Sequence, residues 1–471
     1  MNRTANDASR PSIAVSLPRQ VPLAAEADVL VVGGGPGGLG GAVAAARQGA
    51  DVLLVEHYGF LGGMATAGEV NPFMPNHLDN ASLDTGIFEE WLDRIGSYGG
   101  RRSGTRVFDP NLARLAAEDL CLDAGVRLLY HHRAAHVERS GDRLDAVVLH
   151  GKSGLAAARA KVYVDSTGDG DIAALAGCEF EIGGASGHCQ PLTLCFKLKL
   201  DPRDVPEADR DDPFRAVRAH MQEIQQVFEQ AKADGRIDCP RENVLLFRGV
   251  DDDVIHFNTT RVIHKLSIDA EQLSEAEVLG RRQLRQIVAC FQREVPLLRH
   301  CRIHSIAPQI GVRESRRVLG RAYLTVQDYE VGRTFDDGIA RVTYPIDIHN
   351  PDGKGTVIRR LPAGAWYEVP YRCLVPRGVE NLLIASRCIS ADHATHSSLR
   401  VMPPVCSIGQ AAGTAAAWAV RDGVSPAAID GAALKRALIE QGRNLVDAPA
   451  ATTAEAAGAT ETRPGKSTLS A

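Results

Sequence analysis

A glycine-rich run between two apolar segments is the part of the sequence that points most directly to chemistry. Residues 28–32 predict a short buried strand, Gly33, Gly35 and Gly38 follow in a Gly-x-Gly-x-x-Gly spacing, and 39–48 predict an alanine-rich helix. The first glycine permits a tight turn, the second lets backbone approach a pyrophosphate, and the third lets helix and strand pack closely. The helix N-terminus offers free N–H groups to phosphate. The run therefore predicts dinucleotide binding.

An acidic residue at the end of the next strand narrows the choice of dinucleotide. Residues 51–56 predict a second apolar strand, and Glu56 closes it. A carboxylate at this place accepts hydrogen bonds from the hydroxyls of an adenosine ribose. It favours an unphosphorylated ribose, as in FAD or NAD, over the 2′-phosphate of NADP.

Three later segments favour FAD over NAD. A second glycine turn lies at 61–66, and an expected strand at 162–165 runs into Thr167, Gly168 and Asp169. Such segments can give backbone amides to an extended cofactor. A small-residue helix is expected over 407–421, after a break at Pro403-Pro404 and opening near Gly409-Gln410. Its positive end would stabilise negative charge on a reduced flavin.

Taken together, these segments resemble the FAD-dependent oxidoreductase family of the glutathione-reductase-2 structural type, which is distantly related to the fumarate reductase flavoproteins. The likeness runs from about residue 28 to 419. Beyond the two glycine turns it rests on Asp109-Pro110, Gly168-Asp169-Gly170, Gly311-Val312-Arg313-Glu314-Ser315-Arg316-Arg317, Tyr344-Pro345-Ile346-Asp347-Ile348-His349, Val369-Pro370-Tyr371-Arg372, Ser386-Arg387-Cys388-Ile389-Ser390, Arg400-Val401-Met402-Pro403 and Gly409-Gln410-Ala411-Ala412-Gly413. The resemblance implies non-covalent FAD, a split FAD domain and an inserted substrate domain, and it names no substrate.

The expected fold class is α/β, a Rossmann-like FAD-binding domain with an inserted α+β substrate domain. We expect a flexible leader over 1–24, a split FAD-binding domain over 25–180 and 375–446, a substrate domain over 181–374, and a disordered tail over 447–471. 

Two helices stand out between the motifs. One is expected over 112–124, and a longer one over 274–299, with Ser274 and Glu277 forming a capping box at its start.

The predicted cofactor contacts come from the glycine turns, the acid, and the segments that the resemblance brings to the flavin. They are Gly33, Gly35, Pro36, Gly37, Gly38, Glu56, Gly62, Gly63, Met64, Thr66, Ala135, Thr167, Gly168, Asp169, Arg387, Asp392, Gly409 and Gln410.

Two histidines and an arginine are the catalytic candidates. His396, and after it His393, lie between the last expected strand and the last helix, where a side chain can serve as an acid or base beside a flavin. The alternative is that they are loop residues or hydrogen-bonding struts. Arg313 could clamp a substrate carboxylate, or it could simply pair with Glu314. The pair Asp347 and His349 either faces the substrate or ties its strand to a loop.

Composition excludes several classes of function. The 471 residues include 53 basic and 58 acidic ones, with a net charge of −5 and no basic block, so no nucleic-acid partner is expected. No segment approaches the roughly 20 apolar residues of a membrane span, and we expect a cytoplasmic protein, possibly a homo-oligomer. The ten cysteines show no C-x-x-C spacing, so they predict buried thiols and no metal site.

The sequence therefore predicts an FAD-dependent oxidoreductase (a dehydrogenase, oxidase or reductase) that transfers hydride between a small organic substrate and the flavin. The alternatives are a monooxygenase that uses external NAD(P)H and a redox-neutral flavoprotein. A disulfide reductase is disfavoured, because the sequence has no C-x-x-x-x-C pair and no second Gly-x-Gly-x-x-Gly run.

Overall fold

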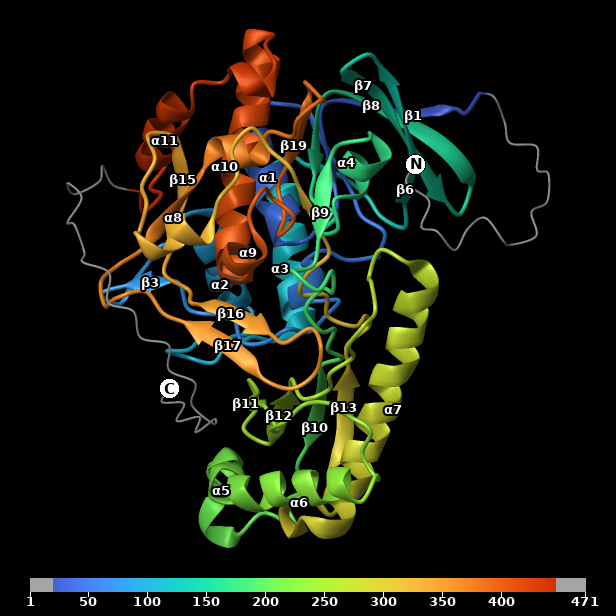
Figure 1. Ribbon diagram of the computed structural model, residues 1–471, viewed down its shortest axis with the longest axis vertical. Coiled ribbons are helices and arrows are strands. Elements are labelled where there is room, and N and C mark those ends of the chain that lie inside the picture. Colours follow the sequence, from blue (N-terminus) through green and yellow to red (C-terminus); the bar gives the residue numbers. More distant parts are fainter. Residues whose placement is uncertain (1–19, 446–471) are drawn as a thin grey trace.

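The computed structural model describes residues 20–445, and its centre is a seven-stranded sheet (Figure 1). The strand β1 (Leu23–Val32) lies between β2 (Val52–Val55) and β8 (Gly154–Asp165), and it is parallel to both. Outside them, β5 (Arg127–Leu129) is parallel to β2, and β19 (Leu382–Ile384) is parallel to the end of β8. This confirms the Rossmann-like α/β fold.

The long strand β8 takes part in two kinds of pairing. Its second half joins the parallel layer, whereas its first half pairs antiparallel with β7 (Arg143–Gly151), which in turn pairs with β6 (Arg133–Ser140). The meander extends the sheet on the side away from β5. Because β8 then ends at Asp165, the segment that follows it emerges at the same edge as the turn after β1.

Helices α1 (Pro36–Arg47) and α10 (Met402–Asp422) are packed against each other and against the sheet. Their contact is made by glycines: a Cβ at Gly409 would lie 2.0 Å from the carbonyl oxygen of Gly37, and one at Gly413 would lie 2.0 Å from that of Gly41. Only residues without a side chain allow the two backbones to approach this closely.

The predicted start of the last helix at residue 407 is wrong. The helix α10 begins at Met402, and Pro403 and Pro404 lie in its first turn, where the missing N–H of proline costs no hydrogen bond. Gly409 and Gln410 therefore lie in the body of the helix and not at its opening.

Three more helices support this half of the molecule. They are α2 (Ile87–Ser97), α3 (Pro110–Asp123) and α11 (Gly431–Glu440). The helix expected over 112–124 is confirmed as α3, which begins slightly earlier because the Asp109 carboxylate accepts hydrogen bonds from the N–H groups of Asn111 and Leu112.

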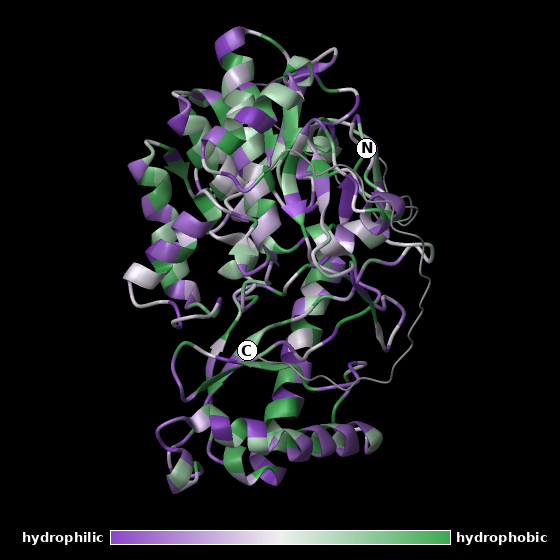
Figure 2. Cartoon of the chain, turned by 90° about the vertical axis from the view of Figure 1, so that its left-hand side faces the viewer, coloured by the Kyte–Doolittle hydropathy of each residue, from purple (hydrophilic) through white to green (hydrophobic). Residues whose placement is uncertain are grey.

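A second hydrophobic core, formed by residues between Leu192 and Val312, makes up the lower part of Figure 1. Its antiparallel sheet follows the order β11 (Leu246–Arg248), β12 (Val254–Phe257), β10 (Phe196–Lys199) and β13 (Arg302–Ile306). The helices α5 (Pro213–Ala219), α6 (Met221–Ala233) and α7 (Ala270–Glu294) pack with it. Figure 2 shows hydrophilic and hydrophobic residues alternating along the helices at the bottom, as expected for helices with one buried face.

The longest helix, α7, starts earlier than the sequence suggests. Asp269 is its N-cap and accepts hydrogen bonds from the N–H groups of Glu271 and Gln272, so the predicted capping box at Ser274 and Glu277 is wrong. Ser274 lies inside the helix, one turn beyond the true cap. The helix ends at Glu294, before Pro296, and not at residue 299.

Four two-stranded sheets and several short helices complete the described part of the chain. The paired strands are β9 (Phe180–Ile182) with β14 (Arg316–Val318), β15 (Gly338–Val342) with β18 (Tyr367–Pro370), β16 (Ile346–His349) with β17 (Thr356–Arg359), and β3 (His77–Leu78) with β4 (Ala81–Ser82). The short helices are α4 (Asp171–Leu175), α8 (Val326–Glu330) and α9 (His393–Leu399). Buried residues of β14, β15 and β18 belong to the first core.

The predicted domain boundaries stay predictions, although the second core covers a shorter stretch than 181–374. Of the leader expected over 1–24, residues 1–19 lie outside the described residues, and Leu23 and Ala24 belong to β1. The tail expected over 447–471 also lies outside them. Among residues 20–445, no helix has the length and apolar character needed to cross a membrane. All ten cysteines are buried and unpaired, as predicted.

The glycine contact between α1 and α10 predicts a strong and local effect on stability. Gly409→Ala would place a methyl group against the Gly37 carbonyl and force the helices apart, so we expect the free energy of unfolding to fall by about 1–3 kcal/mol. Gly41→Ala is the matched control, since its Cβ would meet nothing closer than the Gly409 oxygen at 3.5 Å. Urea unfolding of the purified protein measures both, and equal stability of the two variants would contradict the prediction.

Candidate cofactor and substrate cavity

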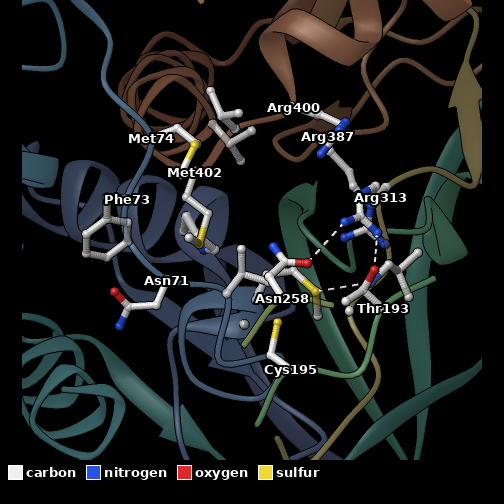
Figure 3. A pocket seen from close by; sticks show the side chains of 18 of the residues that line it. Asn71, Phe73, Met74, Thr193, Cys195, Asn258, Arg313, Arg387, Arg400 and Met402 are labelled. Atoms are coloured by element: carbon white, nitrogen blue, oxygen red, sulfur yellow. Dashed lines mark hydrogen bonds between the residues drawn. The ribbon is translucent and has the colours of Figure 1, made fainter. Parts of the chain in front are cut away.

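One cavity of about 2440 Å³ lies between the carboxyl edge of the parallel strands and the second core. Its wall includes the turn after β1, the segment after β8, parts of the segments 70–107 and 241–248, and the hairpin of β16 and β17. Figure 3 shows side chains along one part of a pocket wall. The cavity therefore brings together segments from both hydrophobic cores.

The glycines of the first turn have two different tasks. Gly33 has φ +100°, and a Cβ there would lie 2.3 Å from the Ser166 oxygen. Cβ atoms at Gly37 and Gly38 would lie 1.8 Å from backbone oxygens of Ala385 and Gly33. At Gly35, by contrast, a Cβ would meet nothing closer than 3.8 Å. Three glycines thus permit close packing, and Gly35 keeps the cavity open.

The helix α1 begins at this turn with an unsatisfied N-terminus. Its N-cap is Gly35, no side chain caps it, Pro36 opens it, and its first turn contains no acidic residue. The free N–H groups and the positive end of the helix therefore form part of the cavity wall, where they are suited to binding a phosphate.

Glu56 lies at the end of β2 and lines the same cavity. One carboxylate oxygen accepts a hydrogen bond from the Gly34 N–H at 2.6 Å, and the other lies 2.9 Å from the Tyr58 nitrogen and 2.8 Å from His57 Nδ1. Burial raises the pKa of Glu56, but His57 and the two backbone donors more than offset it, so the pKa lies below its usual value. The ionised carboxylate is thus fixed beside the glycine turn.

The second glycine turn is tied to the first. The Gly62 N–H donates to the Gly34 carbonyl at 2.8 Å, and the following Gly63 and Met64 line the cavity. Gly62 and Thr66 do not line it. Gly62 precedes a short 3₁₀ helix, and the Thr66 hydroxyl donates to the Leu61 carbonyl at 2.6 Å.

The segment after β8 forms another part of the cavity wall. Thr167, Gly168 and Asp169 all line the cavity, and so does Arg387. An Arg387 guanidinium nitrogen donates to an Asp169 carboxylate oxygen at 2.7 Å. Residues more than two hundred positions apart thus form one ion pair in the wall, close to where the sequence predicted cofactor contacts.

Besides Gly62 and Thr66, five more of the predicted cofactor residues lie outside the cavity wall. Gly38 packs against the turn itself, Ala135 is exposed on β6 while its neighbour Ala134 lines the cavity, and Asp392 caps α9. Gly409 packs against α1, and the side-chain oxygen of Gln410 accepts from the Ile87 N–H at 3.2 Å.

The two candidate histidines also lie outside the residues that line the cavity. His396 is completely buried, and neither of its ring nitrogens has a partner among the described residues. Burial lowers its pKa to about 3, so the ring is neutral. His393 Nδ1 lies 2.8 Å from an oxygen of the buried Glu314 carboxylate, which also accepts from Arg317 at 2.6 Å.

Arg313 does line the cavity, and it does not pair with Glu314. Its guanidinium donates to the Pro191 carbonyl at 2.8 Å. It also donates to the Thr193 hydroxyl at 2.5 Å and to the Asn258 side-chain oxygen at 3.4 Å (Figure 3). All three partners are neutral. The internal ion pair considered from the sequence is formed by Arg317 instead.

The hairpin of β16 and β17 places a polar group on the cavity wall. Tyr344, Asp347 and His349 all line the cavity. An Asp347 oxygen lies 3.3 Å from the Tyr344 hydroxyl and 3.5 Å from His349 Nε2. Burial raises the pKa of Asp347, but His349, Arg400 and Arg313 bring it well below its usual value. Burial and the charge of Arg313 lower that of His349 to about 3. The alternative in which this pair faces the cavity is therefore the one observed.

Further polar residues of the wall carried little or no signal in the sequence. Arg241 lies in a loop before β11, and Asn258 follows β12, so neither belongs to a recognisable motif. Alternation along β16, in contrast, was enough to place Asp347 and His349 on one face. Elsewhere, His188, His264 and Asp352 form an exposed group whose ligand atoms lie within 4.8 Å of one another, and none of them lines the cavity.

The fold and this cavity define an α/β protein with the features of a dinucleotide-binding enzyme. The sequence pattern of the family described as FAD dependent oxidoreductase matches residues 28–438, and the chain belongs to that family. FAD is therefore its cofactor, and the wall described above fits it: Gly35 leaves room, the N-terminus of α1 is free, and Glu56 is ionised.

Similar proteins include a tRNA modification enzyme, a monooxygenase and a dehydrogenase. The tRNA uridine 5-carboxymethylaminomethyl modification enzyme MnmG of Dichelobacter nodosus is 30% identical over 218 residues, which are 43% of this chain and 33% of that protein. The chain thus spans about a third of the length of this curated relative. Among solved structures, p-nitrophenol 4-monooxygenase from Pseudomonas putida is 12% identical with a TM-score of 0.45, covering 85% of this chain and 82% of that one. L-proline dehydrogenase from P. horikoshii is 13% identical with a TM-score of 0.41, covering 88% and 99%.

The free N-terminus of α1 predicts how a serine would compete with the cofactor. In Gly35→Ser, the hydroxyl would cap the helix and occupy the N–H groups that suit a phosphate, so we expect FAD affinity to fall at least about tenfold. Gly35→Ala, which fills space without capping, should lose less. Fluorescence titration of the apoprotein with FAD measures the affinities. Wild-type affinity in the serine variant, with an unchanged fold, would contradict the assignment of this turn to phosphate.

Proposed function

We propose that the protein transfers hydride between a small organic molecule and FAD, as a dehydrogenase, oxidase or reductase. The observation that carries the proposal is that the glycine turn and a polar wall containing Arg313, Asp347 and His349 enclose the same cavity. Sites for one small molecule commonly measure about 300–1,000 Å³. A cavity of about 2440 Å³ has room for the cofactor and a substrate together.

The backbone of the FAD-binding half would hold the cofactor. The free N–H groups of α1 would bind the pyrophosphate, and Glu56 would accept hydrogen bonds from the adenosine ribose. When bound, FAD supplies the hydride acceptor or donor. Val401 and Met402 place the N-terminus of α10 on the cavity wall, without a side-chain cap or an acidic residue in its first turn. Its positive end stabilises negative charge there.

The strand arrangement supports the glutathione-reductase-2 type for this domain. The parallel strands are interrupted by the β6–β7 meander, and the last parallel strand, β19, comes after the whole second core. A split FAD domain requires such an arrangement. The possible homo-oligomer and the cytoplasmic location stay predictions.

His349 is the residue that we assign to proton transfer. Its Nδ1 lies 3.4 Å from the Thr356 hydroxyl oxygen, which can accept a hydrogen bond from Nδ1–H, and its Nε2 lies 3.5 Å from an Asp347 oxygen. In this tautomer Nε2 carries the lone pair that would take up the substrate proton, and the adjacent Asp347 carboxylate would stabilise the imidazolium that forms. His396, the first choice from the sequence, has no such access to the cavity.

The two histidines can be compared directly. We expect His349→Asn to slow anaerobic reduction of the flavin by an organic donor by about 10²–10⁴-fold, the usual contribution of an acid or base. His396→Gln is the companion variant, and stopped-flow absorbance measures both. A larger loss for His396→Gln, with FAD still bound, would return the role to His396.

The reaction class is tested by the choice of reductant. Under anaerobic conditions, we expect the flavin absorbance to persist with NADH or NADPH alone and to bleach with an organic hydroxy or amino compound. Rapid bleaching by NADH or NADPH would contradict a dehydrogenase or oxidase and favour a monooxygenase or a reductase. Stoichiometric FAD that no organic donor reduces would favour a redox-neutral flavoprotein.

A further inference from the structure

Among the arginines of the cavity wall, three that are buried or half-buried have no acidic partner. Arg241, Arg313 and Arg400 come from separate segments, and within residues 20–445 none has a carboxylate oxygen within 4.0 Å of its guanidinium. Figure 3 shows Arg313 and Arg400 on the same side of the pocket, with Phe73, Met74 and Met402 on the other. We call the three residues the arginine cluster.

The hydrogen bonds of the cluster leave much of its capacity unused. Arg241 is only 4% exposed, yet its Nε and Nη1 have no partner. Arg400 makes two long contacts of 3.4 Å, to the side-chain oxygen of Gln190 and the carbonyl of Asp347, and its buried Nε is unpartnered. Arg313 bonds only to neutral groups. Buried guanidinium groups in this state are unfavourable unless an anion joins them.

The charges around the cluster also favour the binding of an anion. Burial and the neighbouring arginines lower the pKa of Arg313 to about 9 and that of Arg241 to about 10, so both stay cationic at neutral pH. The acidic groups that act on the cluster are Asp347 and Glu242. Asp347 also interacts with His349, whose Nε2 lies 3.5 Å from it, and Glu242 forms an ion pair with Arg261 at 3.3 Å. The positive charge of the wall thus exceeds its negative charge.

We propose that the arginine cluster binds a carboxylate of the substrate, an inference that rests on the proposed function and names its substrate class. The planar guanidinium fork matches the two oxygens of a carboxylate. The apolar side chains opposite the cluster suit a weakly polar remainder. The phosphates of the cofactor have a separate place, at the free N-terminus of α1, and Arg387 is already neutralised by Asp169 at 2.7 Å.

Binding of a probe to the FAD-loaded protein tests this without turnover. Phenylacetate would be titrated against the holoprotein, with the flavin absorbance and calorimetry as readouts. Phenylacetamide is the neutral counterpart of the same shape, and inorganic phosphate is the competing oxyanion. We expect phenylacetate to bind at least about tenfold more tightly than either, because only the carboxylate combines charge with an apolar remainder.

Charge-changing variants should move this affinity in opposite directions. Arg313→Gln and Arg400→Gln should each raise the dissociation constant of phenylacetate roughly 10- to 100-fold, and Asp347→Asn should lower it several-fold by removing a repulsive charge. Arg102→Gln is the control, since Arg102 lines the same cavity but is paired with Asp252 at 2.6 Å. FAD affinity should be unchanged in all four, and bound FAD shows that each variant is folded.

Several results would overturn the proposal. Equal binding of acid and amide, tighter binding of phosphate than of phenylacetate, or a loss of FAD affinity in the arginine variants would each remove the carboxylate assignment. Arginine-dependent binding of phenylacetate in a protein whose flavin no organic donor reduces would leave the anion site intact and reject only the hydride transfer. The two proposals therefore fail separately.

Discussion

The backbone contact between α1 and α10 is the constraint on which the rest of the structure depends. Gly37 lies against Gly409 and Gly41 against Gly413, so the two helices run in the same direction at the smallest possible separation. Because α10 starts at Met402, it extends about six residues, or about 9 Å, beyond the start of α1. Two helix ends without side-chain caps thus line the same cavity, one at Gly35 and Pro36 and the other at Val401 and Met402.

The features predicted correctly from the sequence are those that the backbone encodes locally. The first glycine turn and its flanking strands could be recognised because a tight turn between strand and helix needs glycine at fixed intervals, and the same pattern located Glu56 at the end of the second strand, while its contact with a ribose stays a prediction. The same reasoning placed α3, where Asp109 and Pro110 start the helix. FAD followed from these local patterns together with the family resemblance.

The errors came from competing local signals and from tertiary contacts. Pro403-Pro404 suggested a break, but proline in a first helical turn is harmless, so α10 starts earlier. Ser274 and Glu277 fit a capping box, yet Asp269 supplies the true cap one turn before. The burial of His396 depends on how α9 packs, which no local pattern reveals. Arg241 lies on the cavity wall because its neighbours Cys239 and Val244 pack into the second core, which is a tertiary contact that no local pattern reveals.

The hairpin of β16 and β17 has a consequence for the order of events during turnover. Ile358 lines the cavity and is 52% exposed, and its neighbour Val357 is 50% exposed, so solvent reaches the cavity rim at this hairpin. The glycine turn lies elsewhere on the wall, enclosed by Ser166, Ala385 and Gly63. A small molecule that enters past the hairpin meets the polar wall before the glycine turn. Under the proposed function, substrate and product would exchange at this rim while the cofactor stays bound.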